Sequence, residues 1–103
     1  MQTAILNNRK RRPTHPGELI REDILPGLEM SQGTLAELAG VSRQTISELL
    51  TEKRSMSIDL AYRLGRLFNM DGATFIRMQE AVDVWDTLQK YEKEYDKIKP
   101  VVA

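Results

Sequence analysis

The stretch QGTLAELAGVSRQTISELLT, residues 32–51, decides the fold of this chain. Its spacing is typical of two short helices that cross at a tight turn. Ala36 falls where the helices approach most closely, and Gly40 falls in the turn, where a positive φ is favourable only for glycine. The apolar positions expected to pack the two helices together are Leu35, Ala39, Val41, Ile46 and Leu49. The stretch therefore predicts a helix-turn-helix.

The second helix of this motif is expected to have a polar outer face. Ser42 is placed to cap it by accepting a hydrogen bond from a free N–H of the first turn. The positions that do not face the first helix are all polar, namely Arg43, Gln44, Thr45, Ser47 and Glu48. A helix with one buried face and one hydrogen-bonding face suits the major groove of DNA. An ordinary helix hairpin in another small helical protein is the alternative.

The side chains of this outer face suggest particular contacts with DNA. Arg43 can bond guanine bidentately, and Gln44 can do the same with adenine. Thr45 and Ser47 are short donors that could reach either a phosphate or a base edge. Glu48 is ambiguous, because it can accept from cytosine N4 or remain a solvated acid. Ser42, at the start of the helix, belongs to the same candidate DNA-binding set.

Basic residues outside the helices extend the candidate interface. Lys53 and Arg54 follow the second helix and are predicted to contact phosphates. Residues 1–13 read as a flexible basic arm with no acid before Pro13, and its charges are Arg9, Lys10, Arg11 and Arg12. The arm could follow the DNA backbone, enter a minor groove, contact a protein partner or serve only as a solubilising tail.

The remaining periodicity predicts an all-α chain of five helices, since no stretch alternates like a strand. The first helix should begin at Pro16 and end before Pro26, and the second should be capped by Ser31. The fourth should begin near Ser57 and bury an apolar stripe made of Leu60, Ala61, Leu64, Leu67 and Phe68. The expected organisation is an arm at 1–13, a DNA-binding domain at 14–88 and a helical extension at 89–103.

The fifth helix should be capped by Asp71 and run to about Lys99, where Pro100 stops it. It carries two apolar stripes. The stripe assigned to the core consists of Phe75, Met78, Val82 and Trp85. The other stripe, called the C-terminal seam below, consists of Ala81, Val84, Leu88, Tyr91, Tyr95 and Ile98. Its three-and-four spacing predicts a partner helix in a homodimer. The alternatives are a tail that folds back and a helix that frays past Leu88.

Composition excludes several classes of protein. The 103 residues suit one domain, and the absence of cysteine excludes disulfides and thiol chemistry, so a reducing cytoplasm is expected. No apolar run is long enough to cross a membrane. His15 is the only histidine, so no zinc site is predicted, and it reads as an N-cap neighbour. With no nucleophile–base pair, glycine-rich phosphate cradle or paired carboxylates, we expect neither an enzyme nor a cofactor.

Three stretches carry a resemblance to a known family. They are HPGELIREDIL at 15–25, SQGTLAELAGVSRQTISELLTEKRSMSIDLAYRLGRLF at 31–68, and FIRMQEAVDVW at 75–85. Together they resemble the lambda-repressor-like helix-turn-helix superfamily and, within it, the HigA-type antitoxins, also described as VapI-like. The resemblance covers roughly residues 13–88. This chain has Phe75 where the family usually has tryptophan, a mild departure because both are large aromatics.

The resemblance implies a dimeric antitoxin that binds a small RNA-cleaving toxin of the HigB/RelE type and represses its own operon. It also implies a phosphate contact at Gln32, assisted by the helix N-terminus. With a symmetric seam, two recognition helices would read an inverted repeat in double-stranded DNA. Two alternatives remain: a stand-alone phage-type or metabolic repressor without a toxin, and a protein-interaction module that has lost DNA binding. The polar outer face argues against the second.

Overall fold

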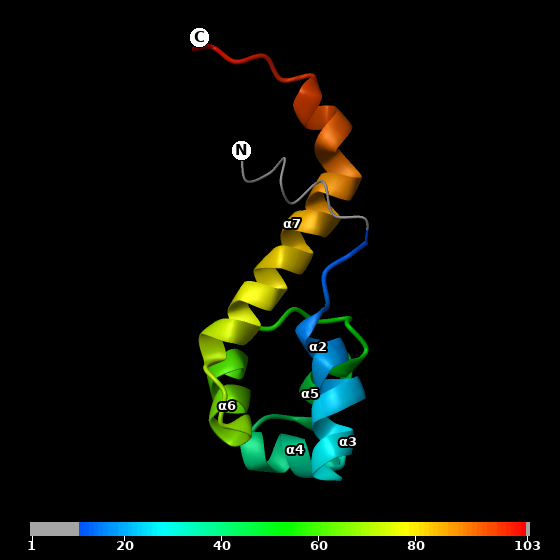
Figure 1. Ribbon diagram of the computed structural model, residues 1–103, viewed down its shortest axis with the longest axis vertical. Coiled ribbons are helices and arrows are strands. Elements are labelled where there is room, and N and C mark those ends of the chain that lie inside the picture. The colour runs from blue at the N-terminus through cyan, green and yellow to red at the C-terminus, as the bar shows by residue number, and fades with distance from the viewer. Residues whose placement is uncertain (1–10, 103) are drawn as a thin grey trace.

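The computed structural model describes residues 11–102, which form helices and connecting turns without a strand. The helical segments are α2 (Pro16–Leu19), η1 (Ile20–Ile24), α3 (Leu25–Leu28), α4 (Gln32–Ala39), α5 (Arg43–Leu50), α6 (Ile58–Phe68) and α7 (Gly72–Asp96). The segments α2, η1 and α3 follow one another without a break and form one continuous rod. With α4, α5, α6 and α7, the described residues therefore form five helical rods, as predicted. Figure 1 shows the shorter rods gathered at one end of the molecule, with α7 projecting away from them.

The helix-turn-helix is formed by α4 and α5, and its local geometry confirms the prediction from spacing. Gly40 ends α4 with a φ of 72°, in the left-handed region that favours glycine. The Ser42 hydroxyl accepts from the Thr45 N–H at 3.0 Å and caps α5. The Ser31 hydroxyl caps α4 in the same way, accepting from the Thr34 N–H at 3.1 Å. Each cap satisfies a backbone donor that has no partner inside its helix.

The prediction that the first helix ends before Pro26 is wrong. The rod continues to Leu28 and ends at Glu29, whose φ is 52°. The reason is the π-helical segment η1, in which the Leu25 N–H bonds to the Ile20 carbonyl five residues back. A proline in a regular α-helix lacks a donor and clashes with the carbonyl four residues earlier. The wider π turn shifts the hydrogen-bond register just ahead of Pro26, so the helix continues through Pro26 and accommodates its ring.

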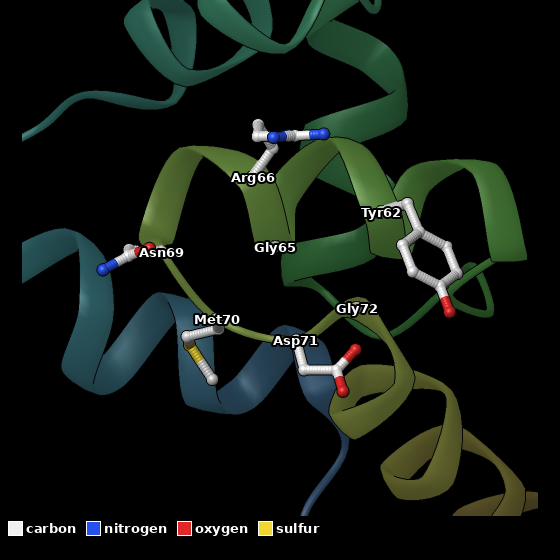
Figure 2. Close-up of a pocket in the computed structure, with 7 residues that line it drawn as sticks. All are labelled: Tyr62, Gly65, Arg66, Asn69, Met70, Asp71 and Gly72. Carbon is white, nitrogen blue, oxygen red and sulfur yellow. The ribbon is translucent and has the colours of Figure 1, made fainter.

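The turn between α6 and α7 is tight because Gly65, inside α6, lies directly against Gly72, the first residue of α7. A Cβ on Gly65 would lie 2.8 Å from the Met70 carbonyl oxygen and 2.9 Å from the Gly72 nitrogen. Figure 2 shows this turn, with Asp71 at the start of α7. The Asp71 carboxylate accepts from the Ala73 N–H at 3.0 Å, so the predicted cap is confirmed.

The α7 rod is long but ends slightly earlier than predicted. Its 25 residues run to Asp96 rather than Lys99, and they span about 37 Å at the usual helical rise. Pro100 disfavours helical backbone only at Lys99, the residue before it, and the helix ends three residues earlier than that.

The core lies between α2, η1 and the four later rods. Its fully buried members come from every rod and include Ile20, Leu35, Ile46, Leu49, Leu64 and Phe75. The predicted α6 stripe is buried at Leu60, Ala61 and Leu64, whereas Leu67 is 37% exposed. In the α7 core stripe, Phe75 and Val82 are buried, and Met78 and Trp85 are half-buried.

The first turn of α2 lies directly against the end of α5. A Cβ added to Gly17 would overlap the backbone carbonyl oxygen of Leu49. The same turn is capped by His15, whose Nδ1 accepts from the Gly17 N–H at 2.9 Å. A backbone atom cannot move aside as a flexible side chain can, so only glycine permits this approach.

We expect Gly17→Ala to lower the free energy of unfolding by about 1–3 kcal/mol, the usual cost of forcing extra volume into a packed site. Gly27→Ala is the matched control, because a Cβ there meets no atom within 4 Å. In a helix it should raise stability by about 0.5–1 kcal/mol. Urea unfolding followed by circular dichroism measures both. Equal stabilities for the two variants would contradict the proposed contact.

Candidate nucleic-acid interface

The α5 helix separates its apolar and polar faces cleanly. Ile46, Leu49 and Leu50 are buried. The predicted contact residues lie on the other side, where Arg43, Gln44 and Ser47 are exposed and Thr45 and Glu48 are half-buried. The outer face predicted from the sequence therefore exists as a continuous surface of one helix.

The N-terminal turns of α4 and α5 lie close together. The Arg43 guanidinium lies beside the Gly33 backbone, where an added Cβ would be 3.5 Å from Arg43 Cζ. Gln32, the residue before it, is exposed at the first position of α4. The structure thus brings Gln32 and Arg43 to one end of the motif, although they are predicted to contact DNA from different helices.

Hydroxyl groups at the start of α5 serve the helix itself. The Ser42 hydroxyl accepts from the Thr45 N–H and also lies 2.8 Å from Thr45 Oγ1. Both hydroxyls therefore have partners within the chain. The Ser47 side chain remains exposed on the outer face, and the Ser47 carbonyl accepts from the Thr51 N–H at 3.0 Å and from the Thr51 hydroxyl at 2.8 Å. Ser47 is the freer short donor of this face.

Glu48 lies in the middle of a chain of polar contacts. Its Oε1 accepts from Arg54 Nη2 at 2.6 Å and from Arg54 Nε at 3.1 Å. Its Oε2 accepts from Gln44 Nε2 at 3.2 Å. Hydrogen bonds from Arg54 and Gln44 hold the pKa of Glu48 below its ordinary value, so the carboxylate stays ionised. Lys53, next to Arg54, makes no ion pair among the residues at 11–102.

The described end of the predicted arm is attached to the protein. Arg9 and Lys10 lie outside the described residues, and Arg11 is exposed. Arg12 bonds Asp86 of α7 through two parallel contacts, Nε to Oδ1 and Nη2 to Oδ2, each 2.8 Å long. Its Nη1 reaches Glu52 Oε1 at 2.9 Å.

These contacts change the charge properties of both partners. They raise the pKa of Arg12 further, chiefly through Asp86, and lower the pKa of Asp86. The Arg12 guanidinium is therefore paired within the chain. A free arm at this position was the sequence prediction, and charge alone gave no sign of this partner.

Sequence reasoning missed the residues that hold the ends of the two motif helices. Arg21 Nη1 donates to the Leu50 carbonyl at 2.6 Å, at the end of α5. Arg63 Nη1 donates to the Ala39 carbonyl at 2.9 Å, at the end of α4. A cation at a helix C-terminus satisfies free carbonyls and complements the helix dipole. Both arginines are distant in sequence from their partners, so no local spacing reveals these contacts.

His15 is the N-cap of α2 rather than its neighbour. It is 3% exposed, and its Nδ1 accepts from the Gly17 N–H, so this nitrogen must carry a lone pair. Burial lowers the pKa of His15, although the carboxylates of Glu52, Asp83 and Asp86 act in the opposite direction.

The C-terminal seam is partly covered within one chain. Leu88 is 8% exposed, and Ala81 and Val84 are half-buried. Tyr91 and Tyr95 are 42% and 45% exposed, with ring centroids 6.3 Å apart. A dimer seam at these residues stays a prediction, and its exposed part lies toward the end of α7.

Other kinds of site receive little support. Over residues 11–102 there is no cluster of three His, Cys, Asp or Glu side chains suited to a metal ion. No helix in that range has both the length and the apolar character needed to cross a membrane. A hollow of about 420 Å³ lies at the α6–α7 turn, lined by the residues labelled in Figure 2. It is separate from the polar face of α5.

Known proteins are similar to this chain in sequence and in structure. The helix-turn-helix family matches residues 20–75. Antitoxin HigA-1 of Vibrio cholerae is 32% identical over 92 residues, covering 89% of this chain and 87% of that protein. This chain belongs to the HigA-type helix-turn-helix antitoxins. The family expected from the three quoted stretches is thereby confirmed.

Solved structures of antitoxins extend the similarity to the architecture of most of the chain. Pseudomonas aeruginosa antitoxin HigA, solved with the higBA promoter, is 30% identical with a TM-score of 0.82, covering 88% of this chain and 100% of its own. Antitoxin GraA in complex with its operator is 29% identical, also with a TM-score of 0.82, covering 93% of this chain and 98% of its own.

We expect the stability of the protein to fall as the pH drops from 7 toward 5. The pKa of His15 is lower in the folded chain than its ordinary value of 6.5, so the unfolded chain binds the proton more tightly. Protonation also removes the lone pair that accepts from Gly17. His15→Asn keeps an N-cap acceptor but cannot titrate. Thermal unfolding at several pH values should show a smaller decline for His15→Asn, and parallel declines would contradict this role.

Proposed function

We propose that this HigA-type chain is the antitoxin of a toxin–antitoxin pair and represses its own operon by binding operator DNA through α5. The observation that carries the proposal is the outer face of α5, where Arg43, Gln44 and Ser47 point away from a buried apolar face. The solved HigA and GraA structures with promoter or operator DNA support it, because they share this architecture over most of the chain. The role is one of binding rather than catalysis.

The residues proposed to contact DNA fall into two groups. Arg43 and Gln44 are placed at the first turn of α5, the part of a recognition helix that reaches base edges. Gln32 and Lys53 are exposed at the start of α4 and after α5, where they can bind the phosphates on either side. Base contacts would specify the operator, and phosphate contacts would position the protein on it.

Dimerisation is proposed through the outer part of α7. The exposed rings of Tyr91 and Tyr95 continue the seam that begins at Ala81 and Val84. A two-fold axis through this seam would present two copies of α5 to one side of the duplex. The operator is then expected to be an inverted repeat, with half-sites about one helical turn or a small multiple apart.

The proposed toxin is a small ribonuclease of the HigB/RelE type, following the family to which the chain belongs. A stand-alone repressor remains the alternative function, and it uses the same α5 face. A binding module without DNA affinity is disfavoured by that face, since the Arg43 and Ser47 side chains are exposed there and make no hydrogen bond among residues 11–102, so their donors are available to DNA.

Two substitutions should separate base contacts from phosphate contacts. Arg43→Ala should weaken operator binding by about 1–3 kcal/mol and relax the preference at one base pair. Lys53→Ala should weaken binding to all sequences alike and reduce the slope of log affinity against log salt by about one. Fluorescence anisotropy with promoter fragments measures both, and footprinting locates the site. A single asymmetric footprint would remove the dimeric reading.

Co-expression tests the antitoxin function. A small basic ribonuclease encoded beside this gene should inhibit growth when expressed alone and should co-elute with this protein on size-exclusion chromatography. Arg43→Ala is the control, because it should reduce DNA binding and leave the complex intact. If the neighbouring product is harmless and does not co-elute, the stand-alone repressor replaces the antitoxin.

A further inference from the structure

A glutamine that reads a base must present its amide in the correct direction. Adenine offers an acceptor at N7 and a donor at N6, and glutamine matches them with its N–H and its carbonyl oxygen. A free amide can turn by half a rotation about its last bond. It then presents a donor where adenine needs an acceptor, an orientation that suits thymine O4 or guanine O6 instead. A surface glutamine therefore discriminates poorly unless its amide is held.

In this chain the amide of Gln44 is held by Glu48, one turn further along α5. The contact joins Gln44 Nε2 to Glu48 Oε2 at 3.2 Å. An ionised carboxylate can only accept hydrogen bonds, so the amide must turn its nitrogen toward Glu48. This leaves Gln44 Oε1 and the second N–H of Nε2 available, which is the pair of groups that adenine requires.

Glu48 is in turn held by Arg54, from the loop that follows α5. Arg54 donates through Nη2 at 2.6 Å and through Nε at 3.1 Å, both to Glu48 Oε1. Both bonds go to Oε1, so Oε2 remains available to accept from Gln44. They also lower the pKa of Glu48, which keeps the group an acceptor only. Each member of the chain thus fixes the direction of the next.

We infer that Glu48 and Arg54 are positioning residues that orient the Gln44 amide for adenine, so that they set base specificity without contacting the base. The inference rests on the proposed binding of operator DNA and names the base that the α5 face reads. It assigns Arg54 a role different from that of Lys53, which makes no ion pair among the described residues and is free to bind a phosphate.

The test begins with the promoter fragment that wild-type protein binds, with each base pair of the site replaced in turn. Gln44→Ala identifies the position that Gln44 reads, which should be adenine. At that position, Glu48→Gln should reduce the preference for adenine by about tenfold, within the discrimination that one bidentate pair provides. A neutral glutamine at 48 can donate as well as accept, so it no longer fixes the Gln44 amide.

Salt dependence separates positioning from phosphate binding. Arg54→Ala should reduce the adenine preference while leaving the slope of log affinity against log salt as in wild type. Lys53→Ala is the matched control, and it should lower that slope by about one and keep the preference. The inference is overturned if Glu48→Gln relaxes a different base pair from Gln44→Ala, since Glu48 would then read a base itself. It is also overturned if Arg54→Ala lowers the slope as Lys53→Ala does and keeps the preference.

A measurement on the free protein keeps this inference distinct from the proposed function. The two side-chain N–H resonances of Gln44 should lie far apart in wild-type NMR spectra. In Glu48→Gln the separation between them should become smaller, because one proton loses its carboxylate partner. Unchanged resonances would overturn the inference whether or not DNA binds. The expected shift without any specific promoter binding would instead refute DNA recognition and, with it, the readout role.

Discussion

The position of α5 depends on how residues 12–21 hold its C-terminal end. Gly17 brings the α2 backbone against the Leu49 carbonyl, and Arg21 donates to the next carbonyl, that of Leu50. Arg12 then pairs with Glu52, whose φ of 62° places it in the left-handed region as the chain leaves α5. With its end held and its inner face buried, α5 has one direction left for its polar face. The proposed readout of DNA needs this rigidity, because base contacts are directional.

The parts of the fold that were predictable are those with a short-range cause. A serine cap acts on an N–H three residues away, and a glycine with positive φ acts on its own turn, so Ser42 and Gly40 could be read from spacing. The buried stripes of α5 and α7 follow from helical periodicity. The π turn before Pro26 has no comparable signature, because it depends on a change of hydrogen-bond register that the residue types do not encode.

In the candidate site, too, the features with a short-range cause were predictable and the long-range contacts were not. The outward residues of α5 were predictable because burial of Ile46 and Leu49 determines which side chains face away. The pairing of those residues was not predictable. Arg54 lies six residues after Glu48, beyond the helix end, and only the path of the connecting loop brings the two together. Charge also misled at Arg12, since a basic run near a terminus does not reveal the acids on a helix 74 residues away.

The contacts of Arg12 also connect α5, which is proposed to bind DNA, with α7, which is proposed to form the dimer. Asp86 lies on α7, the helix that carries the proposed dimer seam, while Glu52 lies just after the end of α5. One guanidinium thus ties the DNA-reading rod to the rod that would carry the partner. Exposed ion pairs contribute little to stability, typically about 0–1 kcal/mol. The Arg12 contacts therefore matter more for the angle between α5 and α7 than for the free energy of folding. In a dimer joined along α7, the angle between α7 and α5 sets the spacing of the two recognition helices, and hence the spacing of the half-sites they can read.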